Sequence, residues 1–435
     1  MFIVIYIAAL LATCLAADCA IRRPWNYPIF LLCAGVLEFG AETGEGMNVS
    51  ALWLLALIGL GIVALIRMPV GRVSFSWPEK AYLMFLAWCL LEAVQAPGMV
   101  YAARMFIKLA FPCLVLVLAR RAVLTGRLNT WKSMRYVFIA SLVAYCFVGG
   151  PTQRLLPIVC WNASVVFWAF AAFADHAAIL GVAALVWWRL YKNRWYLGYA
   201  FLAAVSPALA GIRTGVAAFA IGASVFLLTT YRRAVAIPMV AGIYVLAAAT
   251  FFLVPEFRQR MFFHPNEVDS TSVSVNPFSV STENIDTSGR TAIWEMSMTQ
   301  LWDPHPIAGS GLGAIQEFMY TQQTTDLKVV HSSYVEFLCD TGLVGLTLFI
   351  LATISCWMSG FRMIFKQNTR ETKAFGLCAV CGLPALWFCM GFDNLNNFVL
   401  VATQFPYAFL GIAQGLSEIR RHSPQVGRLE RRIHA

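Results

Sequence analysis

Long apolar segments recur along almost the whole length of this 435-residue chain. A helix needs about 20 apolar residues to cross the ~30 Å hydrocarbon core of a bilayer, and most of the segments approach that length. Hydrophobic residues make up 60% of the chain and charged residues only 12%, against about a quarter charged in soluble domains. Because lipid offers no hydrogen-bond partner, each crossing segment must be helical. The sequence therefore predicts an all-α membrane protein with about twelve or thirteen transmembrane helices. The predicted spans are residues 2–18, 26–41, 50–66, 80–96, 101–119, 136–150, 163–188, 195–210, 214–230, 234–254, 333–358, 374–392 and 396–416.

The basic residues indicate how these helices are oriented. The chain has 32 Lys and Arg against 22 Asp and Glu, and 24 of the 32 lie in alternate loops between the spans. A charge distributed in this way does not form the single basic patch expected of a nucleic-acid-binding protein. The positive-inside rule predicts that those loops and the C-terminal tail are cytoplasmic. The basic clusters lie within residues 22–23, 67–80, 120–135, 189–194, 232–233, 362–373 and 420–432.

One long polar segment interrupts the apolar pattern, on the face opposite the basic loops. Residues 255–332 form the only stretch large enough for a small extramembrane domain. We therefore expect an N-terminal transmembrane bundle (1–254), an outer loop region with short helices (255–332), C-terminal transmembrane helices (333–417) and a cytoplasmic basic tail (418–435).

The second half of this loop carries helix and turn signals. Thr287 or Ser288 can cap a helix over about residues 290–301, which the prolines of WDPHP then end. GSGLG (309–313) predicts a tight turn before a second short helix over about residues 314–321. GSGLG lacks the third glycine and the strand–turn–helix setting of a nucleotide-binding loop, so no nucleotide is expected there.

The outer face of a membrane offers no ATP, which restricts the chemistry available to residues on that side. A bond made there must draw its energy from a preactivated substrate carried in the membrane, such as a polyprenyl-diphosphate-linked sugar. Its diphosphate leaving group requires cations, and guanidinium groups bind phosphate oxygens in paired, charge-assisted hydrogen bonds. The acceptor hydroxyl requires a base nearby.

Two arginines meet the first requirement. Arg213 lies in a break between two apolar segments, in the sequence SPALAGIRTGVAAFA. An arginine at membrane depth costs at least about 2.5–3.5 kcal/mol, so a partner is expected; the alternative is an arginine that snorkels to lipid headgroups. Arg290 stands at the start of the predicted loop helix. A solvated charge is the alternative for Arg290.

His331 is the candidate base. It opens the sequence HSSYVEFLCDTGLVG, where the outer loop meets a predicted membrane helix. With an ordinary pKa near 6.5, a histidine can accept a proton at neutral pH. A structural role is the alternative, because Ser332 and Ser333 can cap the helix, and Gly342 and Gly345 permit close helix packing.

Two further polar pairs lie in or beside the predicted spans. Asp175 and His176 lie deep in one span, where they suit either a proton-coupled transporter or a structural hydrogen-bonded contact. A secondary transporter would show inverted repeats, and we find no such symmetry. Arg104 and Lys108 are four residues apart and share a helix face, where they either extend a diphosphate site or snorkel to headgroups.

Three separated motifs together resemble the O-antigen ligase and Wzy-type polymerase superfamily, inner-membrane glycosyltransferases of the GT-C type. GIRTG around Arg213 is similar to the family's Ser-Arg-Ser/Thr-Gly element, and TSGRTAIW followed by DPHPIAGSGLG is similar to its loop signature, with the second arginine at Arg290. HSSYVEFLCDTGLVG is similar to its histidine motif, with a mild departure at Asp340 and Thr341, where an acid and a small residue are usual. The resemblance covers most of the chain.

The resemblance implies a metal-independent glycosyltransferase without a cofactor, on the periplasmic side of the bacterial inner membrane. Arg213 and Arg290 would bind the diphosphate of an undecaprenyl diphosphate-linked glycan. His331 would act as base toward the acceptor sugar hydroxyl, with inversion at the anomeric carbon. Possible secondary site residues are Arg104, Lys108 and Tyr334.

The sequence leaves the acceptor open. A ligase moves a finished glycan onto lipid A-core, whereas a polymerase joins a repeat unit to a growing O-antigen or exopolysaccharide chain. A secondary transporter or flippase is the more distant alternative. The expected partners are the lipid-linked donor, one of these acceptors and the lipid bilayer, and no nucleic acid.

Overall fold

The computed structural model describes residues 2–37, 49–69, 74–148, 170–209, 212–253, 290–321, 330–366 and 369–422. Regular structure within these ranges is entirely helical, which confirms the predicted all-α membrane fold. Each of the thirteen predicted spans overlaps a helix. The helices are α1 (Phe2–Arg22), α2 (Tyr27–Ala34), α3 (Val49–Arg67), α4 (Trp77–Val94), α5 (Met99–Leu124), α6 (Thr130–Val148), α9 (Phe170–Tyr191), α10 (Arg194–Leu209), α11 (Arg213–Thr230), α12 (Arg233–Leu253), α14 (Arg290–Ser297), α15 (Ala314–Thr321), α16 (Ser333–Lys366), α17 (Arg370–Phe392) and α18 (Gln404–His422).

Seven stretches within the described residues are long and apolar enough to cross a membrane by length and composition. They confirm a multi-pass membrane protein. Parts of the predicted regions lie outside the described residues, namely the first part of the outer loop, with the candidate caps Thr287 and Ser288, and the tail from residue 423. The seven stretches are Met99–Leu124, Phe173–Tyr191, Arg213–Thr230, Arg233–Thr250, Ser333–Phe365, Arg370–Phe392 and Val399–Arg421.

Two predicted spans differ from the observed helices. Residues 26–41 were predicted as one crossing, but α2 ends at Ala34, after eight residues. The span 396–416 begins instead with a 3₁₀ turn, η4 (Leu395–Phe398), and a π turn, η5 (Val399–Thr403), before α18. The two breaks face each other, because a side chain at Gly35 would collide with the carbonyl oxygen of Leu400. Non-helical backbone at this depth is tolerated where protein encloses it, and Gln404 donates a hydrogen bond to the carbonyl of Leu31 across the break at 2.9 Å.

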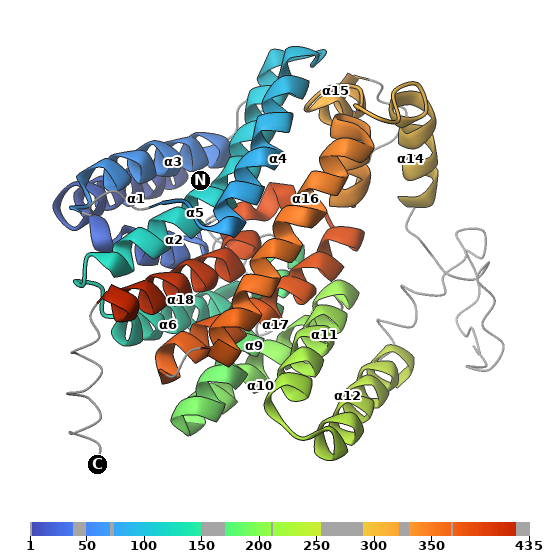
Figure 1. Ribbon diagram of the computed structural model, residues 1–435. Helices are drawn as coiled ribbons and strands as arrows, with labels where there is room; N and C mark the ends of the chain where they lie inside the picture. The colour runs from blue at the N-terminus through green and yellow to red at the C-terminus, as the bar shows by residue number, and fades with distance from the viewer. Residues whose placement is uncertain are drawn as a thin grey trace.

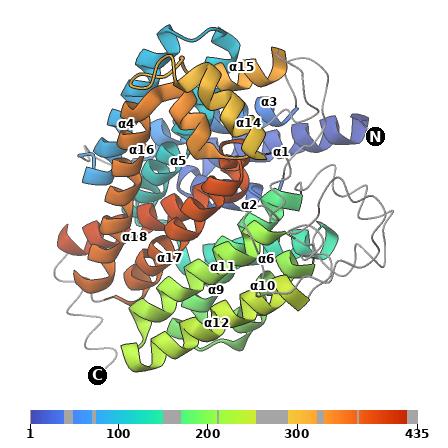
Figure 2. The same cartoon turned by 90° about the vertical axis from the view of Figure 1, so that its right-hand side faces the viewer.

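The C-terminal helices form the centre of the bundle. The most buried helix, α18, packs along α5, while α17 contacts α9, α11, α16 and α18. Figures 1 and 2 show α12 at the edge of the bundle, beside α11, with α14 and α15 next to one end of α16. Segments far apart in the sequence are therefore brought to the two ends of the central helices.

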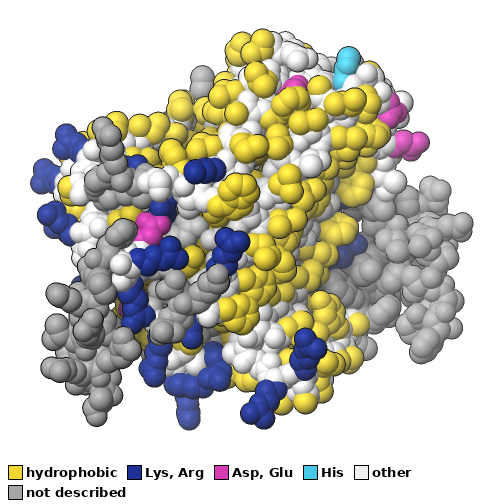
Figure 3. All heavy atoms as spheres, in the orientation of Figure 1, with side chains coloured by type: hydrophobic (Ala, Val, Ile, Leu, Met, Phe, Trp, Pro, Cys, Tyr) yellow, Lys and Arg dark blue, Asp and Glu magenta, His cyan; other side chains and the backbone are white. Residues whose placement is uncertain are grey.

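These two ends differ in charge. We call one the basic end; it carries residues 23–26, 68–69, 74–76, 125–129, 192–193 and 231–232, and the C-terminus of α18 (Figure 1). The other is the site end, with residues 95–98, 212, 330–332 and 393–394. Figure 3 shows Lys and Arg side chains gathered along the left and lower edges of the molecule, separated from the upper right edge by a broad apolar belt. The alternation of loops predicted from the basic clusters is thus present in the fold.

The two short loop helices form where they were predicted. Helix α14 begins at Arg290 and continues as a π turn, η3 (Met298–Trp302), just before the WDPHP prolines; α15 spans Ala314–Thr321. Together with the start of α16 they enclose a small apolar cluster of their own, which includes Ile293, Phe318 and Cys339. This cluster fixes the loop helices against the membrane bundle.

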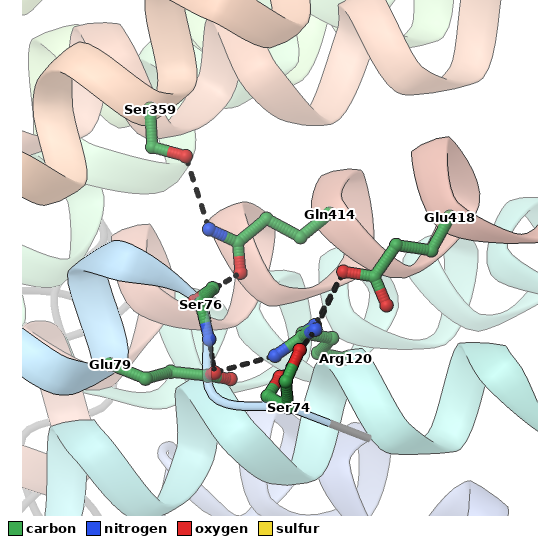
Figure 4. A network of polar contacts seen from close by, with 7 residues as sticks. All are labelled: Ser74, Ser76, Glu79, Arg120, Ser359, Gln414 and Glu418. Carbon is green, nitrogen blue, oxygen red and sulfur yellow. Dashed lines mark hydrogen bonds and ion pairs between the residues drawn. The ribbon is translucent and has the colours of Figure 1, made fainter. Parts of the chain in front are cut away.

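A buried ionic network joins three helices at the basic end. Figure 4 shows the guanidinium of Arg120, on α5, between the carboxylates of Glu79 on α4 and Glu418 on α18. The Arg120 Nη1–Glu79 Oε2 distance is 2.5 Å and the Arg120 Nη2–Glu418 Oε1 distance is 2.6 Å, and the Arg120 and Glu79 side chains are only 6% and 1% exposed. Arg120 also donates to the carbonyl oxygen of Ser74 at 3.0 Å. A charge desolvated to this degree depends on its partners.

We predict that Arg120→Met lowers the free energy of unfolding by about 3–5 kcal/mol, because Glu79 then stays buried without its cation. The double variant Arg120→Met/Glu79→Gln should recover most of this loss. Thermal unfolding of the purified protein in detergent measures the effect. The matched control is Arg22→Met, which breaks an exposed pair with Asp18 (side chains 78% and 60% exposed) and should cost less than about 1 kcal/mol. Equal losses for Arg22→Met and Arg120→Met would contradict the prediction.

Candidate functional site

His331 lies at the site end, directly before α16, in a conformation that is unusual for its residue type. Its φ is +53°, the left-handed region that non-glycine residues rarely occupy. Its ring nitrogen Nδ1 faces Asp393 Oδ1 at 3.6 Å, an ion-pair distance that is too long for a hydrogen bond. The His331 side chain is 31% exposed, whereas that of Asp393 is 6% exposed. The imidazole therefore has a buried carboxylate on one side and an opening on the other.

Asp393 is held by the backbone turn that follows α17. It is the C-terminal cap of that helix, and its N–H donates to the carbonyl oxygen of Cys389 at 2.7 Å. The hydroxyl of Ser333 accepts a hydrogen bond from the N–H of Leu395 at 3.1 Å and donates to the carbonyl oxygen of Asp393 at 3.4 Å. Ser332 accepts from the N–H of Val335 at 3.4 Å, as predicted for a helix cap. Ser333 thus fixes the start of α16 to the end of α17, while Ser332 caps α16 itself.

Arg290 reaches the same turn from the loop helix. Its Nη1 donates to the carbonyl oxygen of Phe392, the last residue of α17, at 2.6 Å. One helical turn further along α14, the indole N–H of Trp294 donates to the carbonyl oxygen of Val330 at 2.7 Å. Residues at i and i+4 share a helix face, so α14 is attached on one side both to the end of α17 and to the residue before His331. The structure therefore brings Arg290 and His331 to one turn.

Arg213 lies at the neighbouring helix start. It is the first residue of α11, and Gly215 packs so closely on α9 that an added Cβ would lie 2.6 Å from Ala174 Cβ. The next residue of α9, Asp175, is wholly buried and lies within electrostatic reach of Asp393. Ala174, which packs against the start of α11, therefore directly precedes the residue of α9 that lies near Asp393. The three motifs of the sequence meet at the same end of the bundle.

Asp175 and His176 have different surroundings although they are adjacent. His176 Nδ1 lies 2.5 Å from the carbonyl oxygen of Val401, and its Nε2 lies 2.9 Å from the hydroxyl of Ser141. It connects α9 with α6 and with the π turn before α18, so the structure favours the hydrogen-bonded alternative for His176. Asp175 instead lies beside the thiol of Cys389, on α17.

The secondary candidates Arg104 and Lys108 face a buried polar cluster. Lys108 is buried and lies within electrostatic reach of Glu336, which is wholly buried on α16. The Glu336 carboxylate also accepts hydrogen bonds from Gln316 Nε2 at 3.1 Å and from Asn396 Nδ2 at 2.6 Å. This cluster joins α5, α15, α16 and the turn after α17. The Nε of Arg104 is buried and has no hydrogen-bond partner among the described residues.

Tyr334 takes part in helix packing. Its hydroxyl donates to the carbonyl oxygen of Trp387, on α17, at 2.9 Å. It lies one residue beyond Ser333 and supports the same α16–α17 contact.

The glycine-rich loop GSGLG packs against the start of α16. Gly309, Gly311 and Gly313 all have positive φ, at +91°, +101° and +81°. The N–H groups of Gly313 and Ile315 donate to the carboxylate of Asp340 at 2.8 and 2.9 Å. The loop therefore lies against α16. Asp340, one of the two residues at which the histidine motif departs from the family pattern, accepts hydrogen bonds from the start of α15.

Sequence reasoning missed Asp393, Glu336 and Asn396. Asp393 lies in the break between the last two predicted spans, on the side away from the basic loops, and Asn396 is the first residue of the final predicted span. An acid in that break is the signal that could have identified Asp393 as a neighbour of His331. Glu336 belongs to the histidine motif, but its sequence position alone indicated no role for it.

Residues 198–350 match a protein-family model described as O-antigen ligase. The matched segment runs from α10 into α16 and contains Arg213, Arg290 and His331, while Asp393 lies beyond it. No curated protein matches the chain. The family match confirms the superfamily resemblance predicted from the three motifs. It supports an enzyme of the glycosyltransferase or ligase type that transfers glycan in O-antigen biosynthesis.

We predict that Gly342→Ala detaches the glycine-rich loop. Helix α16 is kinked at Gly342, with φ +64° and ψ −168°, a conformation that is essentially restricted to glycine. An added Cβ would also collide with the carbonyl oxygen of Ile307. The strain alone is worth about 1–3 kcal/mol, so a lower melting temperature and faster proteolysis around residues 303–313 are expected.

The matched control for this variant is Gly59→Ala. An added Cβ at Gly59, inside α3, would meet nothing within 4 Å, and alanine is the better helix former. Equal melting temperatures and proteolysis rates for Gly342→Ala and Gly59→Ala would show that the kink does not hold the loop.

Proposed function

We propose that this chain, whose residues 198–350 match the O-antigen ligase family model, transfers a glycan from an undecaprenyl diphosphate-linked donor to an acceptor sugar hydroxyl. The reaction takes place at the periplasmic face of the bacterial inner membrane, with inversion at the anomeric carbon. The observation that carries the proposal is the meeting of Arg290 and His331 at the last turn of α17. A cation and a base from separate motifs share one site there.

The arginines bind the donor diphosphate. A guanidinium has five N–H donors, so Arg290 can keep its bond to the carbonyl oxygen of Phe392 and still bind phosphate oxygens. Arg213, at the start of α11, lies at the N-terminal end of a helix, where the macrodipole also favours an anion. As the bond to the sugar breaks, negative charge develops on the diphosphate, and the two cations stabilise it.

His331 and Asp393 act on the acceptor. With Nδ1 directed at Asp393, Nε2 is the nitrogen that remains for the acceptor hydroxyl. The hydroxyl oxygen attacks the anomeric carbon, the bond from that carbon to the diphosphate oxygen breaks, and the hydroxyl proton moves to Nε2. The undecaprenyl diphosphate leaves with the electron pair of the broken bond. The Asp393 carboxylate stabilises the imidazolium that forms and keeps the ring oriented.

The position of the site suits a substrate with a lipid tail. The site residues lie at ends of α11, α16 and α17, all of which contain stretches long enough to cross a membrane. A polyprenyl chain can remain in the bilayer beside these helices while its diphosphate is held at their ends. An active site at a helix end, rather than inside the bundle, follows from that requirement.

The proposal has two forms, which differ in the acceptor of the glycan. Transfer to lipid A-core makes the protein an O-antigen ligase, the activity named in the matched family model. Transfer to another lipid-linked glycan makes it an O-antigen or exopolysaccharide polymerase. Incubating the purified protein with a lipid-linked repeat unit, with and without lipid A-core, separates them, because a ligase gives one transfer product that requires lipid A-core and a polymerase gives a ladder without it. The absence of any transfer product would reject the proposal.

We predict that His331→Asn abolishes glycan transfer in this assay, with a loss of at least about a hundredfold, because general-base catalysis contributes about 10²–10⁴-fold. Asparagine tolerates the left-handed conformation that His331 adopts, so the fold should remain intact. The melting temperature of the purified variant checks that point. Full transfer by His331→Asn in reconstituted liposomes would remove His331 from the chemistry.

We predict that Arg290→Gln weakens donor binding by about tenfold to a hundredfold, the usual contribution of charge-assisted hydrogen bonds. Arg290→Lys should fall between this variant and the wild type, because lysine keeps the charge but loses the planar fork. Binding of a labelled lipid-linked donor measures the series. The control is Arg194→Gln at the basic end, which should bind donor like the wild type. Equal donor affinity across the three Arg290 forms would place Arg290 outside the diphosphate site.

A further inference from the structure

Two neighbouring cavities open at the basic end, remote from the site described above. One has a volume of about 490 Å³ and lies between the α1–α2 connection and the start of α6. The other has a volume of about 510 Å³ and lies between α6 and the start of α10. Lys132 and Tyr136, one turn apart on α6, line both cavities. The two cavities therefore share a wall formed by α6, and together they make one surface feature.

The charged residues that line this feature are all basic. Arg23, Arg127 and Lys132 line the first cavity, and Lys132 and Arg135 line the second; neither is lined by an Asp or Glu. None of these four cations forms an ion pair with a described residue. A cavity with uncompensated cations and no carboxylate is suited to an anion.

Local contacts restrict some of the side chains that line the two cavities. The Arg127 guanidinium lies over the Trp25 ring, 4.7 Å from its centroid, which restricts the side chain to the cavity wall. Asn129 caps α6 by accepting a hydrogen bond from the N–H of Lys132 at 2.9 Å. The positive end of the α6 dipole therefore points into the first cavity and adds to its potential.

An apolar stripe continues from the cavities along α6. Tyr136, Ile139 and Val143 are exposed and follow one another at helical spacing on one face. Trp195 and Phe201 are exposed on the adjacent helix α10. Cavities with basic side chains that lead into an exposed apolar strip match the shape of a phospholipid, with a charged headgroup and acyl chains.

A third cavity at the basic end provides a contrast. It is lined by Arg120, Arg362 and Arg421, but also by Glu418, and Arg120 is fully engaged with two carboxylates. Its charge is partly compensated from within the protein. This cavity therefore contains a carboxylate, which the described lining of the two cavities around Lys132 lacks.

We propose that the two cavities around Lys132 bind the headgroup of an anionic phospholipid from the leaflet at the basic end. The phosphodiester is held by Arg127 and Lys132, and a headgroup with two phosphates, as in diphosphatidylglycerol, occupies both cavities and is bound most tightly. Basic pockets between transmembrane helices on the cytoplasmic side are suited to such headgroups. The site is independent of glycan transfer, since it lies at the other end of the bundle.

The test uses the full-length purified protein and native mass spectrometry with equal amounts of diphosphatidylglycerol and phosphatidylcholine. We expect selective retention of diphosphatidylglycerol, and a loss of about tenfold or more in Arg127→Gln/Lys132→Gln, since each juxtamembrane cation contributes about 1 kcal/mol. Arg127→Lys/Lys132→Arg keeps both charges and should retain the lipid. Failure of the wild type to prefer the anionic lipid would overturn the proposal.

The matched control is Arg232→Gln/Arg233→Gln, which removes the same charge from exposed positions at the same end that line neither cavity. It should retain diphosphatidylglycerol like the wild type. An equal loss in the two double variants would show general electrostatic attraction instead of a site. Millimolar inorganic phosphate should not displace the lipid; displacement would assign the cavities to a soluble phosphate and reject a lipid site.

Discussion

The contact between the glycine-rich loop and the kink of α16 is the interaction on which the rest of the site end depends. The Asp340 carboxylate accepts hydrogen bonds from the N–H groups of Gly313 and Ile315, and the N–H groups of Leu343 and Val344 donate to the carbonyl oxygens of Pro306 and Ile307. These bonds satisfy backbone groups that a kink would otherwise leave unpaired in a buried position. They also fix the loop helices to the bundle, so that Arg290 reaches the end of α17. Without this contact the cation and the histidine would belong to separate parts of the molecule.

Charge is distributed between the two ends of the bundle according to what a membrane permits. At the basic end, Arg120 is buried between two carboxylates, and its ion pairs join α4, α5 and α18. At the site end, His331 is one-third exposed beside the buried Asp393, and Arg290 is held through a backbone carbonyl. The first arrangement compensates its charges internally and is structural. At the site end, the positive charge of Arg290 is not neutralised by a carboxylate of the described residues, and the His331 ring remains partly exposed. Such groups can bind an anionic substrate.

Particular residues show how much of the site the sequence could reveal. His331 was found because the motif around it opens a membrane helix, and Arg290 because a capping signal and two prolines delimit its helix. Both signals are local. Asp393 was missed because it lies 62 positions after His331 and belongs to a different helix pair, and because a single sequence carries no information on which helix ends are neighbours. The role of GSGLG was also hidden, since the sequence does not show that the N–H of Gly313 meets the carboxylate of Asp340, 27 positions further along the chain.

The sequence by itself determined the helical class, the alternation of basic and non-basic loops, and the bounds of the two loop helices. Lipid leaves a long apolar segment only one way to satisfy its backbone, and proline and glycine act on their immediate neighbours. Only the tertiary structure decided that α2 ends after eight residues and that the last span begins with 3₁₀ and π turns, because the two breaks are stabilised by each other. It also decided that Arg290, His331 and Asp393 meet at one turn. Such contacts join residues far apart in the chain, and their free energy comes from packing between helices, which no local pattern encodes.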